Sequence, residues 1–334
     1  MDETAHGKGG SAVNRKISVT LAGASGYTGG ELIRLLLLHP NVSEIAALSS
    51  THAGKAVSEV HSDLFWASSL YFSQTEKVES DVLFLCLPHG KAQQWMNSVH
   101  IAAHTKIIDL SADFRNGSNG FVYGLPELNR NEIAAAAGVA NPGCFATAIQ
   151  LALLPLATAN QLRSPIEITA VTGSTGAGQQ LAAGVHYTWR SANHSAYKEL
   201  EHQHEAEIIR SLTKTQPGFD CEIHFIPQRG NFTRGIWAAL HTETTLRSTE
   251  AEALFRSYYH SHPFTKIITS PADVKMVVNT NYCAIQVCVK NNRVLVTSVI
   301  DNLIKGASGQ AVQNMNLLFG LAEHTGLQLK PSAY

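Results

Sequence analysis

The fold class of this chain is indicated by residues 16–40, KISVTLAGASGYTGGELIRLLLLHP. The first eight residues are rich in β-branched side chains and end at a glycine, which is typical of a short strand. The apolar pattern after the glycines is helical and stops at Pro40. The stretch therefore predicts a strand, a glycine loop and a helix in direct succession.

The residues that follow repeat this alternation of strand and helix. Strands are expected at 44–50, 81–90 and 105–111, and a helix is expected over 91–104. The run at 81–90 is apolar throughout, which is typical of a strand buried on both faces. The first half of the chain thus predicts an α/β fold with a doubly wound, Rossmann-type parallel sheet.

After about residue 150 the strands become longer and hairpin turns separate them. Strands are expected within the segments 166–178, 221–232, 235–245 and 282–301, and a helix over 305–327. This pattern favours an α+β domain with a mostly antiparallel sheet. We expect a flexible lead-in at 1–15, a dinucleotide-binding domain at 16–148 and 304–334, and a catalytic domain at 149–303.

Composition excludes several classes of partner. The 334 residues include 25 Lys and Arg and 26 Asp and Glu, a net charge of −1, which gives no support to nucleic-acid or anionic-membrane binding. No apolar run approaches the roughly 18 residues of a membrane span, and the polar first residues do not resemble a secretory signal, so we expect the cytoplasm.

The five cysteines are an odd number and form no CxxC pair, which argues against a disulfide framework. Cys86, Cys283 and Cys288 are expected to be buried small hydrophobic residues. No His, Cys or carboxylate cluster has metal-ligand spacing, so no metal site is expected.

The glycine loop predicts a dinucleotide site. Glycines let the backbone approach a pyrophosphate, and the free N–H groups at a helix start bind anions. A tight strand–helix turn would also need glycine, but the position of this loop between a strand and a helix favours dinucleotide binding. The residues expected to contact the cofactor here are Gly23, Ser25, Gly26, Tyr27, Thr28 and Gly29.

The end of the second expected strand favours NADP(H). An NAD site would place Asp or Glu there, but the strand ends in Ser49 and Ser50, with His52 and Lys55 close behind. Hydroxyls and cationic groups suit a 2′-phosphate. The alternative is that these residues only form a polar loop.

The segment 141–144, Asn-Pro-Gly-Cys, predicts a tight turn before a helix. Cys144 would begin that helix, where the dipole and free N–H groups favour a thiolate and a developing oxyanion. The alternative is a buried cysteine at a turn. A thiol nucleophile in a dinucleotide-binding protein indicates a thioester that is reduced by hydride, or the reverse reaction from an aldehyde.

Four segments together resemble the N-acetyl-γ-glutamyl-phosphate reductases of arginine biosynthesis: GASGYTGGEL (23–32), VANPGCFATA (139–148), HQHEAEI (202–208) and GNFTRGI (230–236). The resemblance covers residues 17 to about 320. It implies a Rossmann-type domain joined to a substrate domain, NADPH, a catalytic cysteine and a catalytic histidine. It also implies a small acyl phosphate substrate, release of phosphate, and a homo-oligomer that is a dimer or a tetramer.

The resemblance assigns roles residue by residue. His204 matches the second histidine of the family's HxH and is expected as the acid/base, with Glu207 three residues on to orient it and His202 as the fallback or a substrate contact. Further substrate contacts are expected at Arg115, Tyr197 and Arg234. The nicotinamide side is expected at Ser174, Gly176, Ala177, Gly178 and Asn302. The alternative for the substrate contacts is that they are solvated surface side chains. The alternative for residues 174–178 is a plain turn, and for Asn302 it is a helix cap.

One departure from the family bears on the substrate. Many members carry Pro-His-Leu where this chain has Pro227, Gln228 and Arg229. If this loop lines the acyl pocket, Arg229 would favour an acyl group with a negative charge, such as succinyl, over acetyl. Three other functions stay open: a reductase of aspartyl phosphate, a carrier-protein-linked homologue of lysine biosynthesis, and a non-catalytic NADP-binding sensor.

Overall fold

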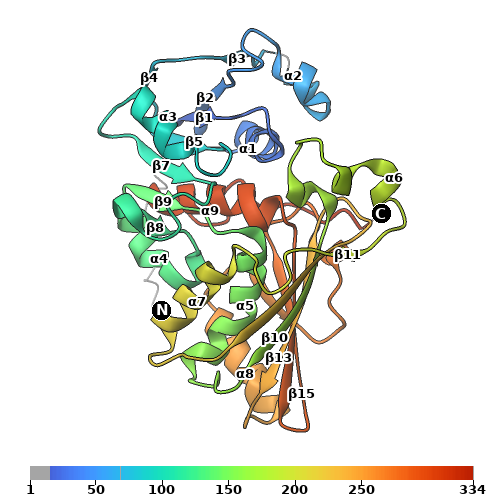
Figure 1. Cartoon of the computed structure of the whole chain (residues 1–334). Coiled ribbons are helices and arrows are strands. Elements are labelled where there is room, and N and C mark those ends of the chain that lie inside the picture. Colours follow the sequence, from blue (N-terminus) through green and yellow to red (C-terminus); the bar gives the residue numbers. More distant parts are fainter. Residues whose placement is uncertain (1–15, 68, 334) are drawn as a thin grey trace, which may run out of the picture.

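The computed structural model describes residues 16–67 and 69–333, which form two seven-stranded sheets and the helices that pack on them (Figure 1). The lead-in expected at residues 1–15 lies outside the described residues. None of the helices in the described part of the chain is long and apolar enough to cross a membrane.

The first sheet is parallel throughout, as the sequence predicted. Its strand order is β3-β2-β1-β5-β7-β9-β8, and every neighbouring pair runs parallel. The order reverses direction beside β1, so the carboxyl ends of β1 and β5 form the crevice in which doubly wound sheets bind ligands. The strands are β1 (Ile17–Ala22), β2 (Val42–Leu48), β3 (Phe72–Ser73), β5 (Val82–Leu85), β7 (Lys106–Asp109), β8 (Val122–Tyr123) and β9 (Gly138–Ala140). Two short strands, β4 (Lys77–Val78) and β6 (His100–Ile101), pair separately.

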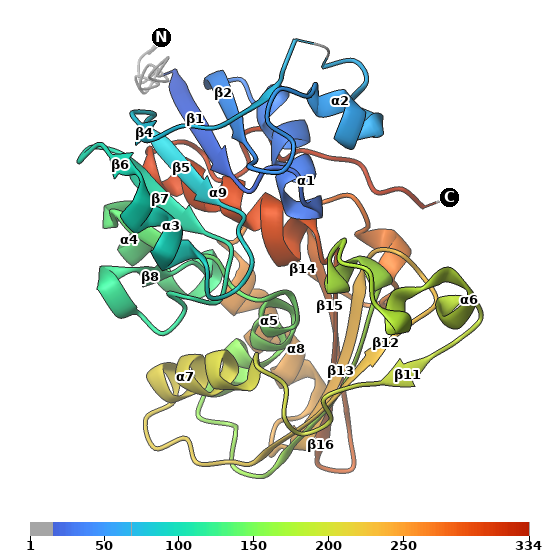
Figure 2. The ribbon, with the colours of Figure 1, turned by 45° about the horizontal axis from the view of Figure 1, so that its top comes forward.

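Helices cover both faces of this sheet. The last helix, α9, comes from the far end of the chain and packs its apolar side chains into the same core as β1 and α1 (Figure 2). The helices are α1 (Tyr27–Leu37), α2 (Val57–Val60), α3 (Ala92–Ser98), α4 (Pro126–Ala135) and α9 (Gly309–Leu318), with short turns η1 (Ser62–Leu64) and η2 (Ser118–Gly120).

Two helices are shorter than the sequence predicted. The helix expected over 91–104 ends at Ser98, because the following residues form the edge strand β6. The segment expected to be helical over 305–327 begins as a π-helical turn, η6 (Ile304–Ser308), continues as α9, and stops before Gly320, whose φ of 67° is left-handed.

The second sheet is mixed, with four of its six neighbouring pairs antiparallel, in the order β11-β12-β10-β13-β16-β15-β14. Asn291 and Asn292 both have positive φ and form the predicted hairpin between β15 and β16. The strands are β10 (Ile166–Thr172), β11 (Ser195–Ala196), β12 (Ile223–Arg229), β13 (Ile236–Glu243), β14 (Thr265–Ile268), β15 (Cys283–Lys290) and β16 (Arg293–Ile300).

Helix α5 (Cys144–Thr158) is the central element of this half. Residues 145–157 are all buried, because the helix is apolar on every side and packs against β13, β16 and two further helices. Those neighbours are α7 (Glu205–Thr215) and α8 (Ser248–Tyr259); the remaining short elements are α6 (Tyr187–Arg190), η3 (Ser174–Ala177), η4 (Ala183–Val185) and η5 (Val274–Met276). Burial on every side fixes the position of the first residue of α5, Cys144.

The non-catalytic cysteines differ in burial. Cys283 is buried as predicted and Cys86 is partly buried. The expectation for Cys288 is wrong: it is exposed, since the last residues of β15 extend beyond the helices toward the hairpin tip.

Candidate active site

The glycine loop lies at the carboxyl end of β1, in the position the sequence predicted. Gly23 has a φ of 79°, and a Cβ at this residue would lie 2.6 Å from the carbonyl oxygen of Cys86. A Cβ at Gly29 would lie 2.4 Å from the carbonyl oxygen of Ala24. Gly26 is the N-cap of α1, so the N–H groups of the first turn have no partner within the helix. The loop therefore fits a pyrophosphate that approaches the backbone closely.

The strand next to the loop, β2, ends in hydroxyl groups. The buried Ser49 hydroxyl lies 3.2 Å from the hydroxyl of Ser25 and 3.3 Å from that of Thr51. Ser50 beside it is exposed, and residues 48–55 contain no carboxylate. This chemistry fits NADP(H): the hydroxyls and Lys55 can receive a 2′-phosphate, which a carboxylate would repel.

Cys144 is the first residue of α5 and is half buried. Burial raises the pKa of its thiol to about 11, although the backbone N–H of Phe145 and the charge of Arg115 act to lower it. The sequence predicted that the helix dipole would favour the thiolate at neutral pH. Desolvation is the larger effect, so the thiol of the free protein is protonated and needs a base.

His204 precedes α7 and packs against the cysteine turn. A Cβ at Gly143, the residue before Cys144, would lie 2.3 Å from Nε2 of His204. Burial, helped by the charge of Arg115, holds the pKa of His204 well below 6.5, so the ring is neutral. Nδ1 of His204 is buried and has no hydrogen-bond partner among the described residues. A neutral imidazole in this position can accept a proton.

His202 supports the backbone of His204. Its Nδ1 accepts the backbone N–H of His204 at 3.2 Å, and the two ring centroids are 4.6 Å apart. Burial lowers the pKa of His202 to about 4. His202 is thus also neutral, and its ring contacts His204.

Glu207 does not orient His204, contrary to our reading of the sequence. Its carboxylate accepts the backbone N–H of Gly143 at 3.0 Å, the hydroxyl of Tyr123 at 2.9 Å and the guanidinium of Arg115 at 2.8 Å. All three bonds hold the turn that carries Cys144. The sequence signal, a spacing of three residues, does not show toward which neighbour a carboxylate turns.

Arg115 is buried in the same cluster. Its Nε donates to the carbonyl of Asn141 at 2.9 Å, while another nitrogen pairs with Glu207. The guanidinium predicted to bind substrate is thus neutralised by Glu207 and directed at the cysteine turn. The Asn141 side chain donates to the carbonyl of Ala307, which ties this turn to η6.

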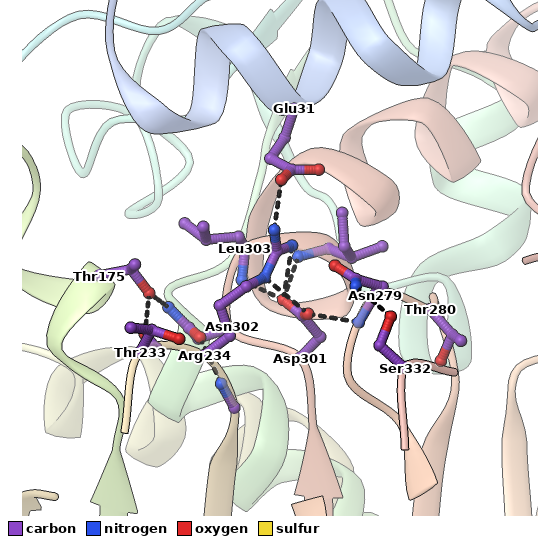
Figure 3. A network of polar contacts seen from close by, with 12 residues as sticks. Glu31, Thr175, Thr233, Arg234, Asn279, Thr280, Asp301, Asn302, Leu303 and Ser332 are labelled. Carbon is purple, nitrogen blue, oxygen red and sulfur yellow. Dashed lines mark hydrogen bonds and ion pairs between the residues drawn. The ribbon is translucent and has the colours of Figure 1, made fainter. Parts of the chain in front are cut away.

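Arg234 and Asn302 belong to a polar network between the two halves of the chain (Figure 3). Arg234 pairs with the fully buried Asp301 at 3.1 Å and with Glu31 of α1. The Asn302 side chain accepts the N–H of Gly235 at 2.7 Å and donates to the hydroxyl of Thr175 at 3.0 Å. Both residues predicted to touch substrate or nicotinamide are thus engaged within the protein.

The expected nicotinamide loop is a 3-10 turn next to this network. The backbone N–H of Ser174 donates to the carbonyl of Phe232, and a Cβ at Gly173 would lie 2.4 Å from the carbonyl of Thr233. Ala177 and Gly176 complete the turn, and Gly178 follows it with a φ of 75°. Asn302 therefore holds this turn in place through Thr175.

Tyr197 and His202 lie together, with ring centroids 5.8 Å apart. The guanidinium of Arg229 stacks over the Tyr197 ring at 4.6 Å. Burial, with the nearby Cys144, raises the pKa of Tyr197 to about 12, so its hydroxyl is protonated. The structure thus brings Tyr197, His202, His204 and Cys144 into one site.

Sequence reasoning missed Gly306. It lies in the π-helical turn η6, and a Cβ at this residue would lie 2.8 Å from Cβ of Cys144. π-helical turns occur often at functional sites. The two glycines of KGASG (305–309) were the available signal. Within residues 16–67 and 69–333, no group of three His, Cys, Asp or Glu side chains could hold a metal ion.

Two family models match most of the chain. One is described as semialdehyde dehydrogenase, NAD binding domain, and matches residues 18–136; the other, semialdehyde dehydrogenase, dimerisation domain, matches residues 144–302. Among solved structures, aspartate semialdehyde dehydrogenase II from Vibrio cholerae, complexed with ASA, has a TM-score of 0.72 over 92% of this chain and 99% of that one. At 16% identity it shows the shared fold.

Curated relatives are much more similar in sequence. A protein named N-acetyl-gamma-glutamyl-phosphate reductase from Flavobacterium johnsoniae is 50% identical over 95% of this chain and 100% of its own length. Proteins of the same name from Parabacteroides distasonis and Bacteroides fragilis are 47% and 48% identical, each over 95% of this chain and their full length. The chain therefore belongs to the N-acetyl-gamma-glutamyl-phosphate reductase family, a family of NADP(H)-dependent oxidoreductases.

Proposed function

We propose that this chain reduces an N-acyl-γ-glutamyl phosphate to the N-acyl-glutamate semialdehyde in arginine biosynthesis, through a thioester on Cys144. The observation that carries the proposal is that Cys144 opens the buried helix α5 while the neutral ring of His204 packs against the same turn. The acyl group is acetyl, as in the names of the relatives, or succinyl.

The first stage transfers the acyl group to the protein. His204 accepts the proton of the Cys144 thiol, and the sulfur attacks the γ-carbonyl carbon. The carbonyl becomes a tetrahedral oxyanion, which the N–H groups at the start of α5 stabilise. When the carbonyl re-forms, the carbon–oxygen bond to phosphate breaks, and a thioester on Cys144 remains.

The second stage releases the aldehyde. NADPH supplies a hydride to the thioester carbonyl carbon. The same N–H groups again stabilise the oxyanion, now on a tetrahedral carbon bonded to Cys144. As the carbon–sulfur bond breaks, the semialdehyde leaves and the protonated His204 returns its proton to the sulfur.

The geometry also supports assignments for the cofactor and the substrate. We assign the cofactor phosphates to Gly23, the first turn of α1 and the hydroxyls after β2, and the nicotinamide side to the turn at 174–178. Substrate contacts are assigned to Tyr197 and His202. We also propose that the chain is a homo-oligomer, dimeric or tetrameric, and acts in the cytoplasm. The division into domains 16–148 with 304–334, and 149–303, stays a prediction.

The test runs the reaction in reverse. Purified protein is mixed with an N-acyl-glutamate semialdehyde, phosphate and NADP, and NADPH formation is followed by absorbance. We expect NADPH only when phosphate is present, and none from Cys144→Ser, which should still bind NADP. A folded protein that binds NADP but gives no signal with either acyl group would support the sensor or carrier-linked function instead.

A further inference from the structure

Two arginines at the edge of the second sheet lack an ion-pair partner. Arg190, at the end of α6, and Arg229, at the end of β12, form no ion pair with any carboxylate in residues 16–67 and 69–333. In both side chains Nε is buried and has no hydrogen-bond partner among the described residues. Arg190 as a whole is 7% exposed. An unpaired buried donor is costly, so both side chains are suited to an acceptor that arrives from outside the chain.

The two guanidinium groups lie on the same face of the sheet. Ser195 of β11 is the antiparallel partner of Arg229, and directly opposite side chains project to one face. The Ser195 hydroxyl accepts from two nitrogens of Arg190, at 3.2 and 3.4 Å. Arg190 thus binds the serine that is paired with Arg229, and neither guanidinium forms an ion pair with a carboxylate of the described residues. A bound anion would supply the hydrogen-bond acceptor and the negative charge that both side chains lack.

This pair belongs to the active site. The Arg229 guanidinium stacks on Tyr197, Tyr197 contacts His202, and His202 contacts His204 beside the cysteine turn. Since the acyl phosphate must react at Cys144, the phosphate is expected at the other end of this series of rings. Arg229 therefore suits the end of the substrate that carries the glutamate α-carbon and its N-acyl group.

The charge of the pair selects among substrates. Away from the reacting carbon, an N-acetylglutamyl substrate carries one carboxylate, and one positive charge of the pair would stay uncompensated. A dicarboxylic acyl group brings a second carboxylate, and arginine binds carboxylates through paired hydrogen bonds. Resting on the proposed reductase reaction, we infer that Arg229, with Arg190 beside it, binds a carboxylate on the N-acyl group, so that the substrate belongs to the N-succinyl class.

The test compares the N-acetyl and N-succinyl semialdehydes in the phosphate-dependent assay. We expect the wild-type protein to prefer the N-succinyl substrate by about tenfold or more in kcat/KM. Arg229→Leu should lower this preference by about tenfold to a hundredfold, mainly through the KM of the N-succinyl substrate. Arg229→Lys should retain part of the preference. The control Arg163→Leu, at an exposed site, should change neither reaction.

Other outcomes overturn the inference and identify a different ligand. An equal loss with both substrates would assign Arg229 to the α-carboxylate that they share. A rise in the KM of phosphate would assign it to the leaving group. The inference is wrong if the wild-type protein prefers the N-acetyl substrate. It is also wrong if Arg229→Leu leaves a preference for the N-succinyl substrate unchanged, because the two arginines would then not discriminate between the acyl groups.

A binding measurement separates this inference from the proposed reaction. Cys144→Ser is titrated by calorimetry with N-succinylglutamate and with N-acetylglutamate, neither of which needs to react. We expect tighter binding of N-succinylglutamate, and loss of that difference in Cys144→Ser with Arg229→Leu. Equal affinities would contradict the inference even if the reductase assay succeeds. If Cys144→Ser binds N-succinylglutamate selectively but the wild-type protein shows no turnover, the proposed reaction alone is contradicted.

Discussion

The carboxylate of Glu207 accepts a hydrogen bond from the backbone N–H of Gly143, the residue directly before Cys144. The same carboxylate pairs with Arg115, and both side chains are only 7% exposed. A charged pair on two distant segments thus fixes the turn on which the nucleophile stands. The His204 ring packs on this turn, so the base and the nucleophile share one support.

Replacing Glu207 by glutamine keeps the shape of the side chain that holds the cysteine turn and removes its negative charge. Arg115 would keep a buried, uncompensated charge, so Glu207→Gln should lower the free energy of unfolding by about 3 kcal/mol and kcat by more than about tenfold. Urea unfolding and steady-state kinetics measure the two effects. The control Glu252→Gln removes an exposed pair with Arg256 and should cost less than about 1 kcal/mol. Unchanged stability in Glu207→Gln would contradict the assigned support.

The raised pKa of Cys144 predicts how its alkylation depends on pH. With a pKa of about 11, the thiolate fraction of the free protein falls tenfold for each unit below it. The rate at which iodoacetamide modifies Cys144, followed by mass spectrometry of its peptide, should therefore rise about tenfold per pH unit from 6 to 9. A rate that levels off below pH 8 would reveal a thiolate paired with a protonated His204, and would refute a neutral pair.

Gly306 has no side chain, which leaves room for Cys144. Replacing Gly306 by alanine should fill that room. A Cβ there would lie 2.8 Å from Cβ of Cys144, so Gly306→Ala should shift the cysteine and lower kcat by about tenfold or more, at a cost of about 1–3 kcal/mol in stability. NADP affinity should stay unchanged, because the glycine loop is untouched. Gly184→Ala is the matched control, since a Cβ there would meet no heavy atom within 4 Å. Equal activities of the two variants would contradict the close packing.

Arg234 should prove to be a structural link between the two halves. Removing its charge leaves the buried Asp301 uncompensated, so Arg234→Met should lower the free energy of unfolding by about 3 kcal/mol or more. A double-mutant cycle with Glu31→Gln should show coupling of about 0.5–3 kcal/mol. If Arg234→Met were instead stable and only raised the substrate KM, the sequence prediction of a substrate ligand would be right.

Local patterns in the sequence predicted what depends on local backbone. The strand, glycine loop and helix at 17–37 and the turn before Cys144 are set by neighbouring residues, and the structure has both where they were expected. The partners of Arg115 and Arg234 could not be predicted, because Glu207 and Glu31 lie far from them in the sequence and the fold alone brings them together.

Burial explains why the pKa of Cys144 differs from the sequence prediction. A cysteine at a helix start predicts a lowered pKa only when water or a cation can reach it. The sequence predicted a helix that begins at Cys144, but it did not show that η6 and the His204 ring would cover the first turn of that helix. Desolvation then exceeds the effect of the helix dipole, so the structure has a neutral thiol beside a neutral base in place of the expected thiolate.

Without phosphate, the thioester on Cys144 should accumulate and can be measured. The protein is mixed with the N-acyl-glutamate semialdehyde and NADP in the absence of phosphate, and both NADPH and the mass of the Cys144 peptide are followed. We predict one equivalent of NADPH per active site, an added acyl group on Cys144, and no further turnover until phosphate is supplied. Continued NADPH formation without phosphate, or a full equivalent of NADPH from Cys144→Ser, would contradict a thioester on Cys144.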